Sequence, residues 1–181
     1  MEEEGGDRPA KAEVTVAVPL VGGGQQLVRV ADAAEFRGAQ VAALPPVAAW
    51  AHVHTVRVNH TALTALPESL ALLARMHTLD VSHNQLGALP AAVGRLPTLE
   101  ALLVGHNALT ALPSLAGLPR LATLDVACNQ LSALPASVGA LRSLQTLNAY
   151  NNLIDTVPPE LGRLSLVSLN LGVNRITHIP G

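Results

Sequence analysis

Residues 76–96 read MHTLDVSHNQLGALPAAVGRL, and this phrase decides the fold because the chain repeats it. Residues 99–118 read LEALLVGHNALTALPSLAGL, and residues 121–141 read LATLDVACNQLSALPASVGAL. Looser copies follow at residues 144–164 and 166–180. A Leu-Pro pair, or its Val-Pro or Ile-Pro variant, returns every 22 or 23 residues. Self-similarity at such a period predicts a solenoid of stacked turns.

The apolar residues of each copy predict where its strand lies. Numbered from their first apolar residue, the copies begin at Ala31, Val53, Met76, Leu99, Leu121, Leu144 and Leu166. Apolar positions 4 and 6 alternate with polar neighbours, which is typical of a strand with one buried face. Position 15 is proline in every copy. Because proline has no backbone N–H, it ends the regular hydrogen bonding. We therefore expect one short strand per turn, followed by a bend and a convex segment.

Position 9 carries asparagine in five copies, at Asn84, Asn107, Asn129, Asn152 and Asn174. The chain must turn inward after each strand, and a buried turn leaves backbone groups that need partners. An amide side chain both donates and accepts hydrogen bonds, so stacked asparagines can satisfy the turns above and below. The pattern predicts a structural asparagine ladder. Thr61 and Ala39 interrupt it, which makes the first copy a degenerate edge turn.

The pattern LxxLxLxxNxLxxLPxxLxxL resembles the leucine-rich-repeat family, especially its intracellular Leu-Pro subclass of Ras-group and related adaptor proteins. The resemblance covers residues 31–181, with six clear repeats and one degenerate repeat. It implies an α/β solenoid of about seven turns, curved like a horseshoe, with a parallel β-sheet on its concave side. It also implies a scaffold or adaptor that binds a partner protein, in cytoplasmic signalling. The alternative is a recognition module that belongs to a larger signalling enzyme.

The two ends of the solenoid need protection, because a solenoid exposes its core there. Residues 13–18 alternate as EVTVAV, and Gly22, Gly23 and Gly24 supply a turn, so residues 11–30 are predicted to form a β-hairpin cap. Residues 1–10 are expected to be a disordered acidic tail. At the other end, the copy that begins at residue 166 lacks a convex segment. We expect Leu166, Leu169, Leu171 and Ile176 to lie exposed, so that either this end self-associates or the chain is a piece of a longer protein.

Composition and motifs exclude several classes of function. The net charge of -2 offers no basic surface for nucleic acid or anionic lipid. The acidic N-terminal sequence lacks the features of a signal peptide, and no apolar run is long enough for a membrane span. The HExxH, GxSxG and CxxC motifs are absent, and Cys128 is the only cysteine. We expect a cytoplasmic, non-catalytic protein without a cofactor.

Histidines recur at position 8, where His60, His83 and His106 precede Cys128 in consecutive copies. Imidazole and thiolate are zinc ligands, so a metal-binding protein is a less favoured alternative. Strands about 4.8 Å apart would separate the ends of this column by roughly 14 Å, too far for one tetrahedral ion. We therefore predict no metal site and read position 8 as a solvent-exposed strand position.

The concave positions 3, 5, 7 and 8 are expected to face a partner. Interface energy concentrates in Trp, Tyr and Arg, which singles out Tyr150 and Arg57. The alternative is that these are ordinary solvated strand residues, with Arg57 paired to Glu35 or Asp80. The predicted binding patch consists of Arg57, Asp80, Leu103, Asp125, Asn148 and Tyr150.

Overall fold

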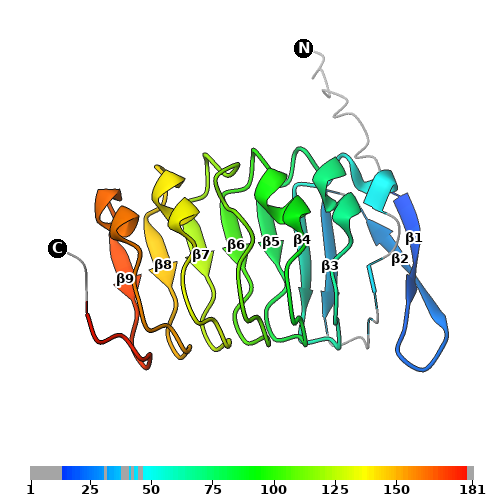
Figure 1. Ribbon diagram of the computed structural model, residues 1–181. Coiled ribbons are helices and arrows are strands. Elements are labelled where there is room, and N and C mark those ends of the chain that lie inside the picture. The colour runs from blue at the N-terminus through cyan, green and yellow to red at the C-terminus, as the bar shows by residue number, and fades with distance from the viewer. Residues whose placement is uncertain (1–13, 31, 38–40, 42, 45–46, 179–181) are drawn as a thin grey trace, which may run out of the picture.

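The computed structural model describes residues 14–30, 32–37, 41, 43–44 and 47–178. The predicted acidic tail at residues 1–10 and the degenerate position at Ala39 lie outside the described residues. Strands β3 to β9 stand side by side in chain order, and short helices lie along one edge (Figure 1). The strands of this sheet are β3 (Ala33–Arg37), β4 (Thr55–Asn59), β5 (Thr78–Asp80), β6 (Ala101–Leu103), β7 (Thr123–Asp125), β8 (Thr146–Asn148) and β9 (Ser168–Asn170).

These strands form one parallel sheet in which equivalent positions of the repeats are neighbours. Thr55 of β4 pairs with Thr78 of β5, and Thr78 pairs with Ala101 of β6. The same register continues to the pairing of β8 with β9. The predicted leucine-rich-repeat fold with a parallel sheet is confirmed. We call the surface formed by strand positions 3, 5 and 7 the sheet face.

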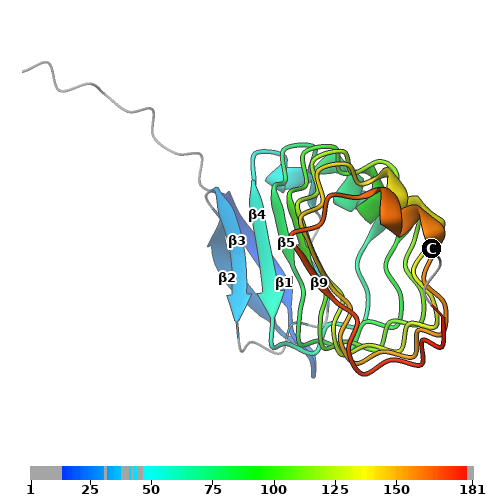
Figure 2. The ribbon, with the colours of Figure 1, turned by 90° about the vertical axis from the view of Figure 1, so that its left-hand side faces the viewer.

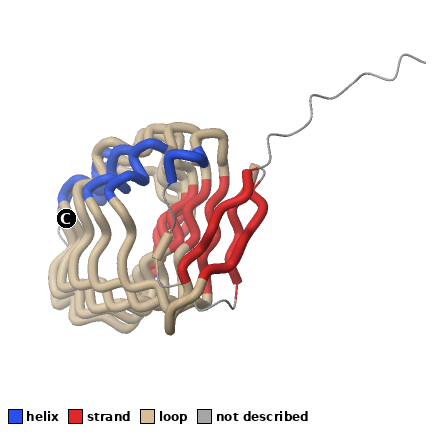
Figure 3. The backbone as a smooth tube through the Cα atoms, turned by 90° about the vertical axis from the view of Figure 1, so that its right-hand side faces the viewer, coloured by secondary structure: helices blue, strands red, loops and turns tan. Residues whose placement is uncertain are grey.

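Each turn of the solenoid runs from the sheet to a helical side, as Figure 2 and Figure 3 show in views along the solenoid. The helical segments are short 3-10 helices. They are η1 (Val47–Trp50), η2 (Glu68–Leu72), η3 (Ala91–Arg95), η4 (Ala136–Ala140) and η5 (Pro159–Arg163). Between η3 and η4, the equivalent residues 114–118 form no helix and contain only a turn at residues 116–117.

One hydrophobic core runs along the interior between the sheet and the helical side. Leu79 and Val81, at positions 4 and 6, are fully buried, as the alternation predicted. Leu86 and Leu89 follow them into the core from positions 11 and 14. Small and branched side chains thus fill each turn, and the few aromatic residues contribute only at the N-terminal end. There Trp50 is buried and stacks on Phe36, with ring centroids 5.9 Å apart.

The N-terminal end carries the predicted β-hairpin. β1 (Val14–Pro19) pairs antiparallel with β2 (Gln25–Val30). The turn between them contains Gly22 and Gly23 at φ values of 91° and 81°, a conformation that glycine adopts without steric cost. Val18 and Val30 of the hairpin are buried in the same core as the repeats.

The C-terminal end is more exposed to solvent than the N-terminal end. All three residues of β9 are exposed, and Leu169 is 46% exposed. An apolar hollow of about 330 Å³ lies at this end, lined by residues that include Leu161, Leu164 and Leu166. The expectation of exposed apolar residues in the last copy therefore holds for Leu169, whereas Leu166, Leu171 and Ile176 are half-buried.

Candidate functional site

The asparagines at position 9 hold the turns that end the strands. The side-chain Nδ2 of Asn129 donates to the carbonyl oxygens of Val104 and Val126, at 3.1 and 3.0 Å. Its Oδ1 accepts a hydrogen bond of 3.0 Å from the backbone N–H of Leu109 in the preceding repeat. One side chain thereby joins two neighbouring turns. Equivalent hydrogen bonds are made by Asn84, Asn107, Asn152 and Asn174.

Thr61 does not reproduce this arrangement. Its hydroxyl donates a 2.6 Å hydrogen bond to Oδ1 of Asn84, in the next repeat. The asparagine of the following turn therefore satisfies the threonine, and the ladder begins at Asn84.

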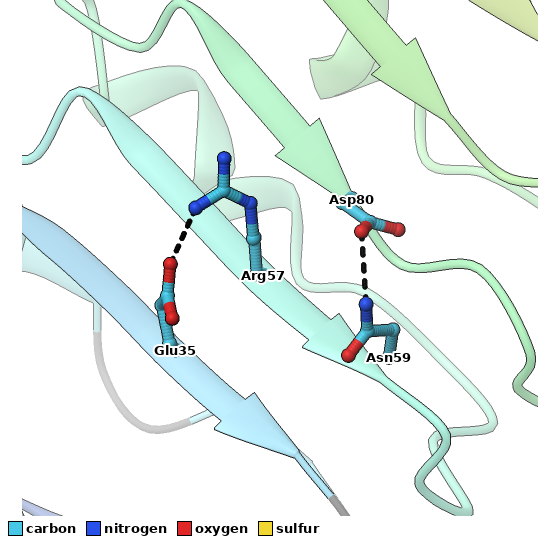
Figure 4. Close-up of polar contacts among 4 residues, drawn as sticks. All are labelled: Glu35, Arg57, Asn59 and Asp80. Carbon is cyan, nitrogen blue, oxygen red and sulfur yellow. Dashed lines mark hydrogen bonds and ion pairs between the residues drawn. The ribbon is translucent and has the colours of Figure 1, made fainter.

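Position 5 has a structural role that sequence reasoning missed. The carboxylate of Asp80 accepts hydrogen bonds from the backbone N–H and the hydroxyl of Ser82, at 3.1 and 2.7 Å. The amide of Asn59 donates to its other oxygen at 2.9 Å (Figure 4). Asp80 is only 8% exposed, so the expectation that it faces a partner from an open position is wrong. Its carboxylate is occupied by its own turn and by the neighbouring repeat.

Asp125 and Asn148 at the same position accept from the backbone N–H two residues later, at Ala127 and Tyr150. A short polar side chain just before a turn commonly makes such a bond. The recurrence of Asp or Asn at position 5 was the signal that could have revealed it.

Arg57 forms an ion pair with Glu35 on the adjacent strand (Figure 4). This was one of the two pairings expected for Arg57, and the other expected partner, Asp80, is taken by Asn59 and Ser82 instead. Both side chains of the pair are more than one third exposed. Exposed ion pairs stabilise a fold only slightly, so Arg57 remains available to exchange Glu35 for a partner's carboxylate.

The C-terminal half of the sheet face presents the largest exposed aromatic side chain. Tyr150 is 41% exposed and lies beside Gly172, which has no side chain to cover the ring. Leu103 is half-buried near the centre of the sheet, and Gly105 and Ala127 beside it are small and buried. Of the predicted patch, Tyr150 is exposed and the Arg57 side chain is 37% exposed, whereas Leu103 is half-buried among small residues. Asp125 and Asn148 are half-buried.

Position 8 is a left-handed turn residue, so its interpretation as a strand position is wrong. His60, His83 and His106 have φ values of 54°, 54° and 55°, and they lie beyond the ends of β4, β5 and β6. The three rings stack, with centroids 4.1 Å apart in both pairs and interplanar angles of 12° and 11°. We call these three exposed residues the histidine column. Cys128 continues it and accepts a 3.6 Å contact from the amide of Asn151.

The rings of the column influence one another electrostatically. The pKa of His83 is lowered from 6.5, first by desolvation and then by the charges that His106 and His60 can carry. The carboxylates of Asp80 and Asp125 oppose this shift. The column therefore favours neutral imidazole at its centre.

A second pair of stacked histidines lies at position 2, before the strands. The rings of His54 and His77 have centroids 5.3 Å apart. Within the part of the chain that the structure describes, no group of three or more His, Cys, Asp or Glu side chains is arranged to hold a metal ion. No helix among the described residues is long and apolar enough to cross a membrane.

Comparison with known proteins relates this geometry to a family. Residues 119–176 match the family described as leucine rich repeat. No curated protein matches the sequence. Among solved structures, a leucine-rich-repeat protein of Leptospira interrogans is similar at 25% identity and a TM-score of 0.61, over 81% of this chain and 44% of its own.

Two further structures are similar. The leucine-rich-repeat domain of the type III effector XopL shares 25% identity at a TM-score of 0.77, over 83% of this chain and 55% of its own. The plant peptide hormone receptor RGFR1, solved in complex with RGF2, shares 28% identity at a TM-score of 0.66, over 71% and 22%. The chain therefore spans about half or less of the length of these proteins. The chain therefore has the leucine-rich-repeat fold, and its residues 119–176 match the leucine rich repeat family.

Proposed function

We propose that this chain is a non-catalytic scaffold that binds a partner protein on its sheet face, with Tyr150 as the main contact. Leucine-rich-repeat domains generally mediate protein–protein interaction, and the related receptor RGFR1 was solved in complex with RGF2. The observation that carries the proposal is the exposure of Tyr150 on a face where the neighbouring side chains are small or held by the fold. Tyrosine combines a large apolar surface with a hydroxyl and is enriched in the residues that dominate interface energy.

The other accessible groups of the face define the rest of the contact. Leu103 supplies an apolar surface near the centre of the sheet, and Arg57 supplies a cation at its N-terminal side. A partner that contacts Arg57, Leu103 and Tyr150 would span five strands, from β4 to β8. Such a footprint matches the elongated surfaces that solenoids offer to their ligands.

Site-specific photocrosslinking tests the proposal. A photoreactive phenylalanine analogue replaces Tyr150 on the sheet face, and in a matched variant it replaces Arg163 on the helical side. With extract from the native cells, we expect a discrete crosslinked protein at Tyr150 and none at Arg163. The same crosslinked protein at both positions, or a crosslink only at Arg163, would contradict the assignment of the face.

The Leu-Pro pairs extend this proposal to a cytoplasmic adaptor in signalling, as the resemblance to that subclass implies. The extension is tested by the identity of the crosslinked partner. A signalling component of the cytoplasm supports it, whereas a secreted or cell-surface partner contradicts it.

We also propose that the C-terminal end self-associates. Val167 is 83% exposed and Leu169 is 46% exposed beside the outer edge of β9. No further strand of the described residues pairs with this edge, and such strand edges with apolar neighbours invite pairing. Light scattering across a concentration series should show growth beyond the mass of a monomer. Appending a polar capping repeat should restore the monomer, and a clean monomer at high concentration without that cap would contradict the idea.

A further inference from the structure

The histidine column concentrates three ionisable rings on an exposed rim next to the sheet face. His60, His83 and His106 follow β4, β5 and β6, and their rings are parallel within 12°. All three side chains are exposed. The column therefore presents a row of imidazole nitrogens to solvent rather than to the core.

The fold does not require histidine at these positions. Cys128, Asn151 and Val173 occupy the same left-handed position in later repeats, with φ values of 53° to 55°. Asparagine adopts this conformation more readily than most residues. Three consecutive imidazoles are thus a chemical feature added to a turn that other side chains also complete.

The carboxylates nearest to the column already accept hydrogen bonds from other groups. Asp80 and Asp125 are the carboxylates that act on His83. Asp80 is bonded to Asn59 and Ser82, and Asp125 accepts from the backbone of Ala127. Among the described residues, no acidic side chain forms an ion pair with any of the three rings. Cys128, the titratable group that continues the column, contacts Asn151.

Desolvation and the neighbouring rings lower the pKa of His83, the central ring of the column. Each added proton places a positive charge about 4.1 Å from the next ring, and like charges at such a separation repel. An anion that bridges the rings removes this repulsion and gains charge-assisted hydrogen bonds. Anion binding and proton uptake are therefore thermodynamically linked. A metal ion is less suited, because the nitrogen lone pairs of parallel rings point alongside one another rather than toward one centre.

We infer that the histidine column binds the carboxylates of an acidic segment of the partner protein and takes up protons as it does so. The inference rests on the proposed function, because it names the charge of the partner and the pH dependence of its binding. Affinity then rises as the pH falls through the range in which imidazole titrates.

Calorimetric titration of the purified chain with a hexaglutamate peptide tests this inference. Titrations at pH 7.5 and pH 5.5 use the same ionic strength and contain a chelator, and the peptide remains largely ionised at both pH values. We expect binding to be about ten-fold tighter at pH 5.5, the gain that one charge-assisted hydrogen bond supplies. Repeating the titration in buffers of different ionisation enthalpy should reveal proton uptake.

The matched variants use a substitution that the chain itself accommodates at position 8. His60→Asn, His83→Asn and His106→Asn, combined in one protein, should remove the pH dependence, since Asn151 occupies an equivalent left-handed turn. His54→Asn with His77→Asn alters the other stacked pair and should leave the binding unchanged. Equal affinity at both pH values, or an equal loss in the position-2 variant, overturns the inference.

Two additional variants test the inference if the triple variant does not fold and distinguish it from the proposed function. If the triple variant fails to fold, His83→Asn alone should reduce the pH dependence by at least half, and an unchanged dependence contradicts the inference. Arg163→Ala should leave hexaglutamate binding intact, because it alters the helical side and not the column. Failure of the Tyr150 crosslink with intact hexaglutamate binding would refute the proposed face, whereas the reverse result would refute the column.

Discussion

The helical side and the sheet face of the solenoid are assembled from the same repeats but leave different amounts of space. On the helical side, a Cβ added to Gly94 would lie 2.1 Å from the carbonyl oxygen of Ser114 in the next turn. A Cβ added to Gly139 would lie 2.3 Å from Cβ of Glu160. On the sheet face, a Cβ added to Gly105 or Gly172 would meet its nearest neighbour at 3.3 Å.

This difference suggests that the helical side determines the stability of the fold, whereas the sheet face determines the binding of a partner. The helical side brings backbones of neighbouring turns together, so its contacts fix the stacking of the repeats. The sheet face keeps its backbones at the spacing of hydrogen-bonded strands, so an added Cβ makes a tight contact there rather than an overlap. We therefore expect substitutions on the helical side to change the free energy of unfolding and substitutions on the sheet face to change affinity.

The largest expected effect belongs to Gly94→Ala. The added methyl group overlaps a backbone oxygen that cannot rotate away, so adjacent turns must separate. We expect a loss of about 3 kcal/mol in the free energy of unfolding, at the upper end of the cost of overpacking. Urea denaturation measures it. Gly162→Ala is the control, because nothing lies within 4 Å of its added Cβ, and equal losses in both variants would refute the close-packing account.

Asn129→Ala tests the ladder that joins the two sides. The substitution leaves the carbonyls of Val104 and Val126 and the N–H of Leu109 without their side-chain partner. We expect a loss of about 1–3 kcal/mol, the cost of unsatisfied buried polar groups. Thermal unfolding followed by circular dichroism provides the measurement. Gln130→Ala, at the exposed neighbouring residue, should have the melting temperature of the wild type. An unchanged melting temperature in Asn129→Ala would contradict the stabilising role of the ladder.

Val173→Asn should stabilise the chain. Val173 is 60% exposed and adopts a φ of 55°, a conformation that is costly for a branched residue. Asparagine at this position should raise the free energy of unfolding by about 1 kcal/mol, the order of the left-handed penalty. The reciprocal change Asn151→Val should lower it by a similar amount. Chemical denaturation measures both variants. A lower free energy of unfolding in Val173→Asn, or a higher one in Asn151→Val, would contradict the assignment of strain to position 8.

The pH dependence of stability should show a smaller contribution from His83. Because its pKa is lowered in the folded chain, the unfolded chain binds the proton more tightly. The stabilisation is fully present above about pH 6.5 and is lost as the pH falls below it. His83→Asn should therefore flatten the decline in unfolding free energy between pH 7.5 and 5.5. A decline of the same slope in the variant would show that other groups cause it.

Most of the fold was predictable because its determinants are periodic. The spacing of leucines located the strands and the buried positions, and the alternation at residues 13–18 with the glycines after it located the hairpin. The packing glycines also recur, at Gly94, Gly117 and Gly139, although their spacing in the sequence does not show how near the next backbone lies.

The candidate site was predicted less well, because its properties depend on contacts between repeats. Asp80 looked exposed from its place in the alternation, but Asn59 from the neighbouring repeat covers its carboxylate. Position 8 looked like the end of a strand, but the turn forces it into a left-handed conformation. That turn, together with the strand spacing, stacks the histidine rings. The sequence alone showed only that histidine recurs at position 8.

The affinity of the crosslinked partner for two single variants tests most directly the claim that the sheet face is the binding surface. Tyr150→Ala removes the exposed aromatic ring, and Arg163→Ala removes an exposed side chain of the helical side. With both variants folded as judged by their melting temperatures, we expect Tyr150→Ala to weaken binding about ten-fold or more, as loss of an interface hot spot does. Arg163→Ala should bind like the wild type. Equal affinities for the two variants, or a larger loss in Arg163→Ala, would contradict the account.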